Sequence, residues 1–176
     1  NFNELFLSLT SSVSNIGFAL DNNSTNLSFI FLIIVMIGGS FFSTSSGIRF
    51  LKIYSLFKYS INEILSYSRP KNIFINKHLF SKESFKLNEI YKYFLTIIIF
   101  IISLLFLTSL LTFSGIQFED SFKIAILTLM NTVNSSTYGL ATFNFYDLHF
   151  STKNFLIFFM IIGRLELLTL LIICKK

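Results

Sequence analysis

The sequence predicts an all-α protein embedded in a membrane, and three observations support this fold class. Hydrophobic residues make up 53% of the 176 residues and charged residues only 13%. In a soluble domain about a quarter of the residues are charged. Apolar segments of membrane-spanning length recur along the chain. One of them is interrupted by a run of glycine, serine and threonine, which a bilayer tolerates only under special conditions.

Three long apolar segments account for the predicted spans. The first runs over 27–37 and resumes, after the interruption, over 48–57. The second is the nearly uninterrupted run 94–113, and the third is 155–174. The core of a bilayer requires about 20 consecutive apolar residues in a helix. We therefore expect the second and third segments each to cross the membrane as one helix.

The interruption in the first segment is the most informative feature of the chain. It reads Ile37-Gly38-Gly39-Ser40-Phe41-Phe42-Ser43-Thr44-Ser45-Ser46-Gly47. Backbone polar groups in hydrocarbon must be hydrogen-bonded within the protein, so a break at membrane depth survives only where it lines an enclosed polar cavity. Broken membrane helices of this kind mark ion and substrate pathways. The interruption therefore predicts a transport function.

The charges predict how the chain is oriented. Nine of the 14 lysine and arginine residues lie between Arg49 and Lys92, and the chain ends on two further lysines. The segment 114–153 carries three acidic residues and only two lysines. The positive-inside rule places 58–92 and the C-terminus in the cytoplasm and 114–153 outside. The net charge of +5 is explained by this topology, so we expect no nucleic-acid partner.

Two short apolar helices are predicted at 4–13 and 122–133. At roughly three turns they are too short to span a membrane but can re-enter one. Each leads toward a tract with serine or threonine and one glycine. Ser14-Asn15-Ile16-Gly17-Phe18-Ala19 matches Ser136-Thr137-Tyr138-Gly139-Leu140-Ala141 at an offset of 122 residues. The match and its surroundings predict an internal repeat of short helix, glycine tract and membrane helix.

A re-entrant helix followed by such a tract suits a cation path. The C-terminal end of the helix carries partial negative charge, and an extended tract can turn its backbone carbonyls toward a cation in place of water. Glycine adopts the positive φ angles that this requires. Taken alone, each glycine could equally end a helix before a surface loop. The repetition favours two ion-binding filters, formed by Ser14, Asn15, Ile16 and Gly17 and by Thr137, Tyr138 and Gly139.

Four motifs together resemble the Trk/Ktr/HKT superfamily of potassium transporters, whose members have four membrane–pore-loop–membrane repeats around one ion path. The motifs are Ser14-Asn15-Ile16-Gly17-Phe18, the loop signature Gly38-Gly39-Ser40, Ser43-Thr44 and Gly47-Ile48-Arg49, the filter Thr137-Tyr138-Gly139-Leu140, and Gly163-Arg164-Leu165-Glu166. The chain departs from the family pattern at Phe42 and Ser46, where glycine is usual, and at Asn15, where threonine is usual.

The resemblance is to the C-terminal portion of a TrkH-like membrane subunit, and we expect the chain to be a fragment that lacks the earlier repeats. It implies that 1–62 ends the third pore repeat, 63–92 is a cytoplasmic basic connection and 93–176 is the fourth repeat. It further implies uptake of K⁺ or Na⁺ across the cytoplasmic (inner) membrane with no bound cofactor. A homodimer in membrane lipid and a cytosolic nucleotide-binding regulatory subunit near 58–92 are implied as well. The gating loop would comprise Gly38, Gly39, Ser40, Ser43, Thr44 and Gly47.

Arg164 is predicted to face the ion path. An arginine inside a span costs roughly 2.5–3.5 kcal/mol on insertion scales, so it should meet a cavity or a partner. The hydroxyls and carbonyls of the 38–47 loop can accept hydrogen bonds from its five donors, and the resemblance favours this position below the filter. The alternative is that the side chain reaches the membrane interface.

Other function classes find less support. The chain has no nucleophile–base pair, no phosphate-binding Gly-Lys-Ser/Thr ending and no His or Cys cluster at metal-ligand spacing, so we do not expect an enzyme. A secondary transporter of another solute would explain the interruption without any filters. A purely structural membrane subunit would explain the spans, but neither Arg164 nor the interruption.

Overall fold

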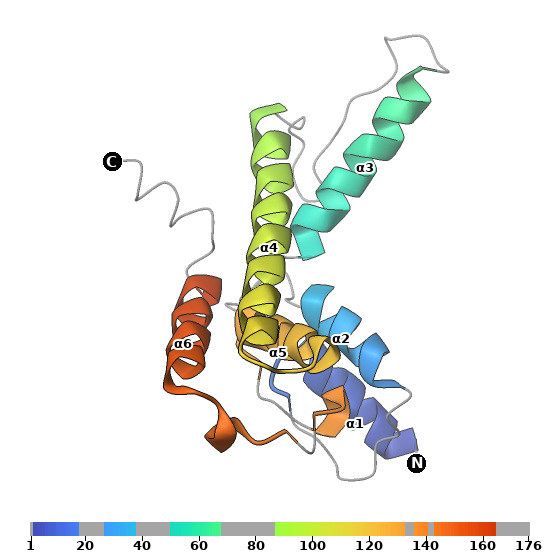
Figure 1. Cartoon of the computed structure of the whole chain (residues 1–176). Helices are drawn as coiled ribbons and strands as arrows, with labels where there is room; N and C mark the ends of the chain where they lie inside the picture. The colour runs from blue at the N-terminus through green and yellow to red at the C-terminus, as the bar shows by residue number, and fades with distance from the viewer. Residues whose placement is uncertain are drawn as a thin grey trace.

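The computed structural model describes residues 2–17, 27–37, 50–67, 87–132, 136–140 and 143–164, and the regular elements in these ranges are all helical (Figure 1). The all-α prediction is thus confirmed for the part of the chain that the structure describes. In chain order the elements are α1 (Phe2–Val13), α2 (Ser28–Ile37), α3 (Phe50–Ser66), α4 (Leu87–Phe113), α5 (Phe118–Met130), η2 (Ser136–Tyr138), η3 (Phe145–Asp147) and α6 (Phe150–Arg164).

Helix α4 is the longest of the described helices. Its stretch Glu89–Phe113 has 25 residues and a mean hydropathy of 2.8, and it is the one helix among the described residues that is long and apolar enough to cross a membrane. At about 1.5 Å per residue it exceeds the roughly 30 Å of a bilayer core. The span predicted at 94–113 is therefore confirmed, and the helix extends beyond it at the N-terminal end.

The surface of α4 has the character expected of a helix in lipid. Large apolar side chains such as Ile102, Leu105 and Phe106 are more than half exposed. The hydroxyls of Thr96, Ser103, Thr108, Ser109 and Thr112 all bond to carbonyls three or four residues earlier, at 2.7 to 2.9 Å. Hydroxyl groups satisfied by their own helix can face hydrocarbon without an unmet hydrogen bond.

The other predicted segments are helical where they are described. Helix α2 is described as far as Ile37 and α3 from Phe50, and the predicted interruption at 38–47 lies outside the described residues. Helix α6 begins at Phe150, five residues before the predicted third segment, and is described as far as Arg164. The crossing by 155–174 and the boundaries at 62 and 92 stay predictions.

Helix α5 lies at the centre of the packing. It contacts α2, α4 and α6, and in Figure 1 it crosses the lower end of α4 with α6 on one side and α2 on the other. Every residue from Ile124 to Met130 is buried. The helix begins four residues before the predicted 122–133 because Glu119 and Asp120 occupy its first turn, where carboxylates are favoured by the helix dipole.

The contact between α5 and α6 requires a glycine. A Cβ atom placed on Gly163 would lie 2.3 Å from the backbone oxygen of Leu129, and no real Cβ atom approaches so closely. Beside it, the side-chain amide of Asn131 donates to the carbonyl of Met160 at 3.0 Å. These two contacts fix the C-terminal end of α5 against α6, and they give Gly163 a packing role that the motif alone did not reveal.

We expect Gly163→Ala to destabilise the protein, because the backbones of α5 and α6 must separate to admit the methyl group. Overpacking of this kind typically costs about 1–3 kcal/mol. The measurement is thermal unfolding in detergent, with Gly115→Ala as the control. A Cβ at Gly115 meets nothing within 4 Å, although φ there is +93°, so only backbone strain is added. A melting temperature of Gly163→Ala equal to that of the wild type would contradict the close-approach argument.

Candidate functional site

Helix α1 buries polar side chains and exposes apolar ones, which is the reverse of a helix in a soluble protein. Its buried residues are Ser8, Ser11 and Ser12, and Asn15 just beyond it is also buried. Its apolar side chains are instead between 43% and 57% exposed, namely Leu5, Phe6, Leu7, Leu9 and Val13. An apolar outer face around a polar inner face is what a membrane-embedded helix next to a polar path requires.

Helices α1 and α5 end in the same way. Asn15 and Asn131 both adopt the left-handed conformation, with φ of 57° and 54°. The amide of Asn15 donates to Ser12 and that of Ile16 to Ser11, and the amides of Asn131 and Thr132 make the equivalent bonds at 3.2 and 3.0 Å. This is the Schellman pattern, which satisfies the last carbonyls of a helix.

The two helices also correspond along their length. Asn15 and Asn131 are 116 residues apart, and at that offset Phe2 pairs with Phe118 and Phe6 with Phe122. Each Phe pair stacks, with ring centroids 6.4 and 6.3 Å apart. The two helices thus share local features at an offset of 116 residues, which differs from the 122 of the sequence match, and the repeat itself stays a prediction.

The glycine tracts follow a different offset. We call residues 14–17 the Gly17 tract and residues 136–139 the Gly139 tract. Their glycines are 122 residues apart, six more than the helix caps, so the second repeat has six extra residues between cap and glycine. Both glycines adopt positive φ, 76° and 75°, as predicted. The prediction of extended backbone was wrong for the second tract, because Ser136–Tyr138 forms a 3₁₀ turn.

The predicted filter residues differ in their surroundings. Thr137 and Tyr138 are fully buried, at 2% and 0% exposure, and Asn15 is 8% exposed. Ile16 is 62% exposed, and the exposed Ser14 hydroxyl donates back to the carbonyl of Thr10 at 2.9 Å. Ile16 and Ser14 can therefore serve a filter only through their backbone, whereas Asn15 and Thr137 bring buried side-chain oxygens.

Unpaired polar atoms gather at and beside the two tracts. Among the described residues, the buried side-chain atoms without a hydrogen-bond partner are Ser11 Oγ, both polar atoms of the Asn15 amide, Thr132 Oγ1, Thr137 Oγ1 and the Tyr138 hydroxyl. A buried polar group left unpaired costs about 1–3 kcal/mol, and such groups in native proteins usually hold water or an ion. No hydroxyl of α4 is in this state.

Two of these groups, Ser11 and Thr132, were not predicted. Ser11 precedes Asn15 by four residues, which places both on one helix face, and Thr132 follows the cap residue Asn131. The Tyr138 hydroxyl also lies near that of Ser12, although no hydrogen bond of ordinary geometry joins them. The side chain of Tyr138, in the Gly139 tract, therefore reaches the polar face of α1, and the two repeats meet there.

The predicted gating elements are only partly described. Gly38, Gly39, Ser40, Ser43, Thr44 and Gly47 lie outside the described residues, as do Leu165 and Glu166. Arg164 is the last described residue of α6, and its side chain is exposed. The contact between Arg164 and the 38–47 loop stays a prediction.

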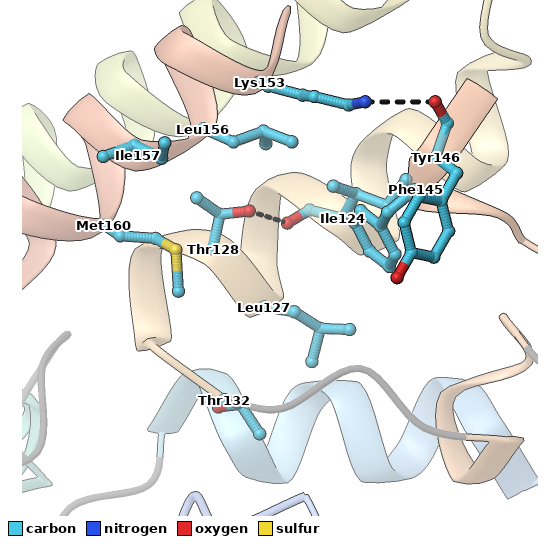
Figure 2. Close-up of a pocket in the computed structure, with 10 residues that line it drawn as sticks. All are labelled: Ile124, Leu127, Thr128, Thr132, Phe145, Tyr146, Lys153, Leu156, Ile157 and Met160. Carbon is cyan, nitrogen blue, oxygen red and sulfur yellow. Dashed lines mark hydrogen bonds between the residues drawn. The ribbon is translucent and has the colours of Figure 1, made fainter. Parts of the chain in front are cut away.

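An apolar pocket lies between α5, η3 and α6, and Thr132 is one of its lining residues (Figure 2). Its volume is about 570 Å³, and its walls are mainly carbon from residues such as Leu127, Leu156 and Met160. Lys153 at its edge donates to the carbonyl of Tyr146 at 3.0 Å, and the Thr128 hydroxyl is bonded to Ile124. The pocket contains no predicted filter residue and offers a cation few ligands, so it is not the candidate path.

We expect Thr137→Val to leave stability unchanged or to raise it, because the hydroxyl that it removes has no partner among the described residues. The matched control is Thr108→Val, which removes a hydroxyl equally buried but bonded to Leu104 at 2.8 Å. Losing that bond should cost about 1 kcal/mol. Thermal unfolding in cation-free detergent buffer tests the pair. A larger loss for Thr137→Val than for Thr108→Val would show that the Thr137 hydroxyl is paired after all.

The comparison with known protein families agrees with this geometry. The family described as TrkH, cation transport protein, matches residues 2–176, which is almost the whole chain. No curated protein matches it. The resemblance found in the motifs is confirmed, and with it a membrane protein that transports cations and is not an enzyme. The chain belongs to the TrkH family of cation transport proteins.

Proposed function

We propose that this chain forms part of a path for K⁺, or alternatively Na⁺, across the cytoplasmic membrane, with the Gly17 and Gly139 tracts as ion-binding filters. The observation that carries the proposal is the gathering of unpaired buried polar atoms at and beside these two tracts. A cation, partly stripped of its water, would be held by those oxygens and by the backbone carbonyls around the glycines.

The chemistry of these groups suits an alkali cation. Hydroxyl, amide and carbonyl oxygens are neutral, hard ligands of the kind that replaces a hydration shell without trapping the ion. The left-handed glycines turn the chain sharply at both tracts, a conformation that residues with a side chain rarely adopt. The inverted polar face of α1 supplies a route lined with hydroxyl groups beside the first tract.

The gate and the assembly belong to the same proposal. Because glycine, serine and threonine interrupt the apolar sequence at 38–47, this segment can serve as an intramembrane gate. Arg164 would act as its counterpart, supplying hydrogen-bond donors and an electrostatic barrier. A homodimer, and a cytosolic nucleotide-binding subunit docking near 58–92, complete the proposed transporter.

A secondary transporter of another solute through the broken helix is the second candidate. Such a protein would need the interruption at 38–47 but not two glycine tracts with shared backbone conformation. The positive φ angles of Gly17 and Gly139 therefore favour the filter mechanism. Uptake of radioactive Rb⁺ and Na⁺ by the complete protein in proteoliposomes separates the candidates. Rb⁺ uptake blocked by excess K⁺ supports the filters, and its absence in folded protein supports the other solute.

We expect Gly17→Ala and Gly139→Ala each to lower Rb⁺ uptake about tenfold and to weaken selectivity over Na⁺. A side chain in the left-handed region costs about 1–2 kcal/mol per residue, and both glycines adopt positive φ. Gly115→Ala is the control, since Gly115 has positive φ but lies at the end of α4. Unchanged flux and selectivity in both filter variants would refute the assignment.

We expect deletion of residues 41–45 to raise cation flux, because a shortened loop would block the inner path less completely. The measurement is Rb⁺ uptake by the purified variant, normalised to the amount of folded protein. The wild-type chain in the same vesicles is the reference. Flux that stays the same or disappears in well-folded protein would count against a gating role for the loop.

A further inference from the structure

Lys123 carries the one ammonium group that the described residues place beside a glycine tract. It lies in the second turn of α5, with Nζ 2.6 Å from Oε1 of Glu119 and 4.0 Å from Oδ1 of Asp120. Its side chain is 13% exposed, whereas that of Glu119 is 78% exposed. The charge of Lys123 is therefore mostly buried and is neutralised by carboxylates at the outer end of α5.

The buried end of this side chain meets the Gly139 tract. A Cβ atom at Gly139 would lie 3.4 Å from Lys123 Nζ and 3.5 Å from the hydroxyl oxygen of Ser28. The ammonium and the hydroxyl thus lie at ordinary contact distance from the side of Gly139 on which a side chain would project. Helix α2, which carries Ser28, contacts both α5 and η2, so the tract is enclosed on this side by two helices.

The ion pair is maintained at neutral pH. The hydrogen bond from Lys123 lowers the pKa of the Glu119 carboxyl below its ordinary value. A carboxyl with a lowered pKa in the folded state stays ionised above that pKa, and its pairing is lost only as the pH falls through it. The Glu119 carboxylate therefore stays ionised beside Lys123 at neutral pH.

The first repeat has no ammonium group at the position equivalent to Lys123. At the offset of 116 residues that aligns α1 with α5, the residue equivalent to Lys123 is Leu7 and that equivalent to Glu119 is Asn3. The stacked Phe pair and the asparagine cap are present in both helices. An ammonium is therefore not needed to build this kind of helix, and its place in the second repeat points to a different task.

We propose that Lys123 is a specificity-determining residue, whose ammonium, offset by Glu119 and Asp120, sets the electrostatic potential at the Gly139 tract and thereby its affinity for a cation. This inference rests on the proposed function of the tract as a filter. A fixed positive charge disfavours a second cation nearby, and an opposing carboxylate restores the balance. The three side chains together bring one positive and two negative charges to the mouth of the tract.

The test compares the Michaelis constant for Rb⁺ uptake among charge variants of the complete protein in proteoliposomes. Lys123→Met should lower this constant several-fold, on the order of tenfold for groups in contact. Glu119→Gln should raise it. The double variant restores the net charge of the wild-type cluster and should return close to the wild-type constant. Lys123→Arg keeps the charge and should change it little.

Lys153→Met is the matched control. Lys153 lies in the first turn of α6, and its ammonium binds the carbonyl of Tyr146 at the edge of the apolar pocket. The same substitution there should leave the constant for Rb⁺ unchanged. Should Lys123→Met fold poorly, Lys123→Gln replaces it, and the shift in melting temperature with added Rb⁺ reports binding independently of flux.

The outcomes separate charge from packing. A role as a mere support for the tract predicts that Lys123→Met lowers the maximal rate without lowering the Michaelis constant, and that result would overturn the proposal. A double variant whose Michaelis constant stays as far from the wild-type value as that of Lys123→Met would do so too. If the wild-type protein takes up no alkali cation, the proposed function itself fails. If the wild type takes up Rb⁺ and all the charge variants have its Michaelis constant, only the proposed role of Lys123 is refuted.

Discussion

The structure depends on one constraint, that polar groups at membrane depth must find hydrogen bonds within the protein. The span α4 meets it by turning each hydroxyl back to its own helix. The short helices meet it at their ends, where Asn15 and Asn131 direct backbone amides to the last carbonyls. By contrast, the buried polar groups of Ser11, Asn15 and Thr137 have no hydrogen-bond partner among the described residues. Their oxygen atoms are therefore available to bind a ligand.

Helix α5 shows how the fold positions such a place. It is buried from Ile124 to Met130 and contacts α2, α4 and α6. At its C-terminal end the backbone of Leu129 touches Gly163, and Asn131 is bonded to α6. At its other end Lys123 lies against Gly139. A helix fixed at both ends gives the tract that follows it a rigid wall, which precise coordination of a cation requires.

Local patterns in the sequence predicted what is locally determined. The apolar run of α4, the two short helices and the positive φ of Gly17 and Gly139 depend on neighbouring residues and were predictable. The contacts of Gly163 with Leu129 and of Lys123 with Gly139 join residues far apart in the chain, so no local pattern reveals them. The 3₁₀ turn at Ser136–Tyr138 was missed because six extra residues separate the cap from the glycine, and an alignment on the glycines alone hides that insertion.

The insertion and the lysine make the two tracts unequal although their helices are alike. The Gly17 tract follows its helix cap directly and has only neutral polar groups described near it, whereas the Gly139 tract is farther from its cap and lies beside a buried ion pair. Conduction requires sites that bind an ion well enough to admit it and weakly enough to release it. Since equal tracts would bind equally, a charge carried by one repeat alone lets the protein adjust one set of oxygen ligands without altering the other. Divergence between the repeats is then a means of tuning affinity while the shared helix geometry is kept.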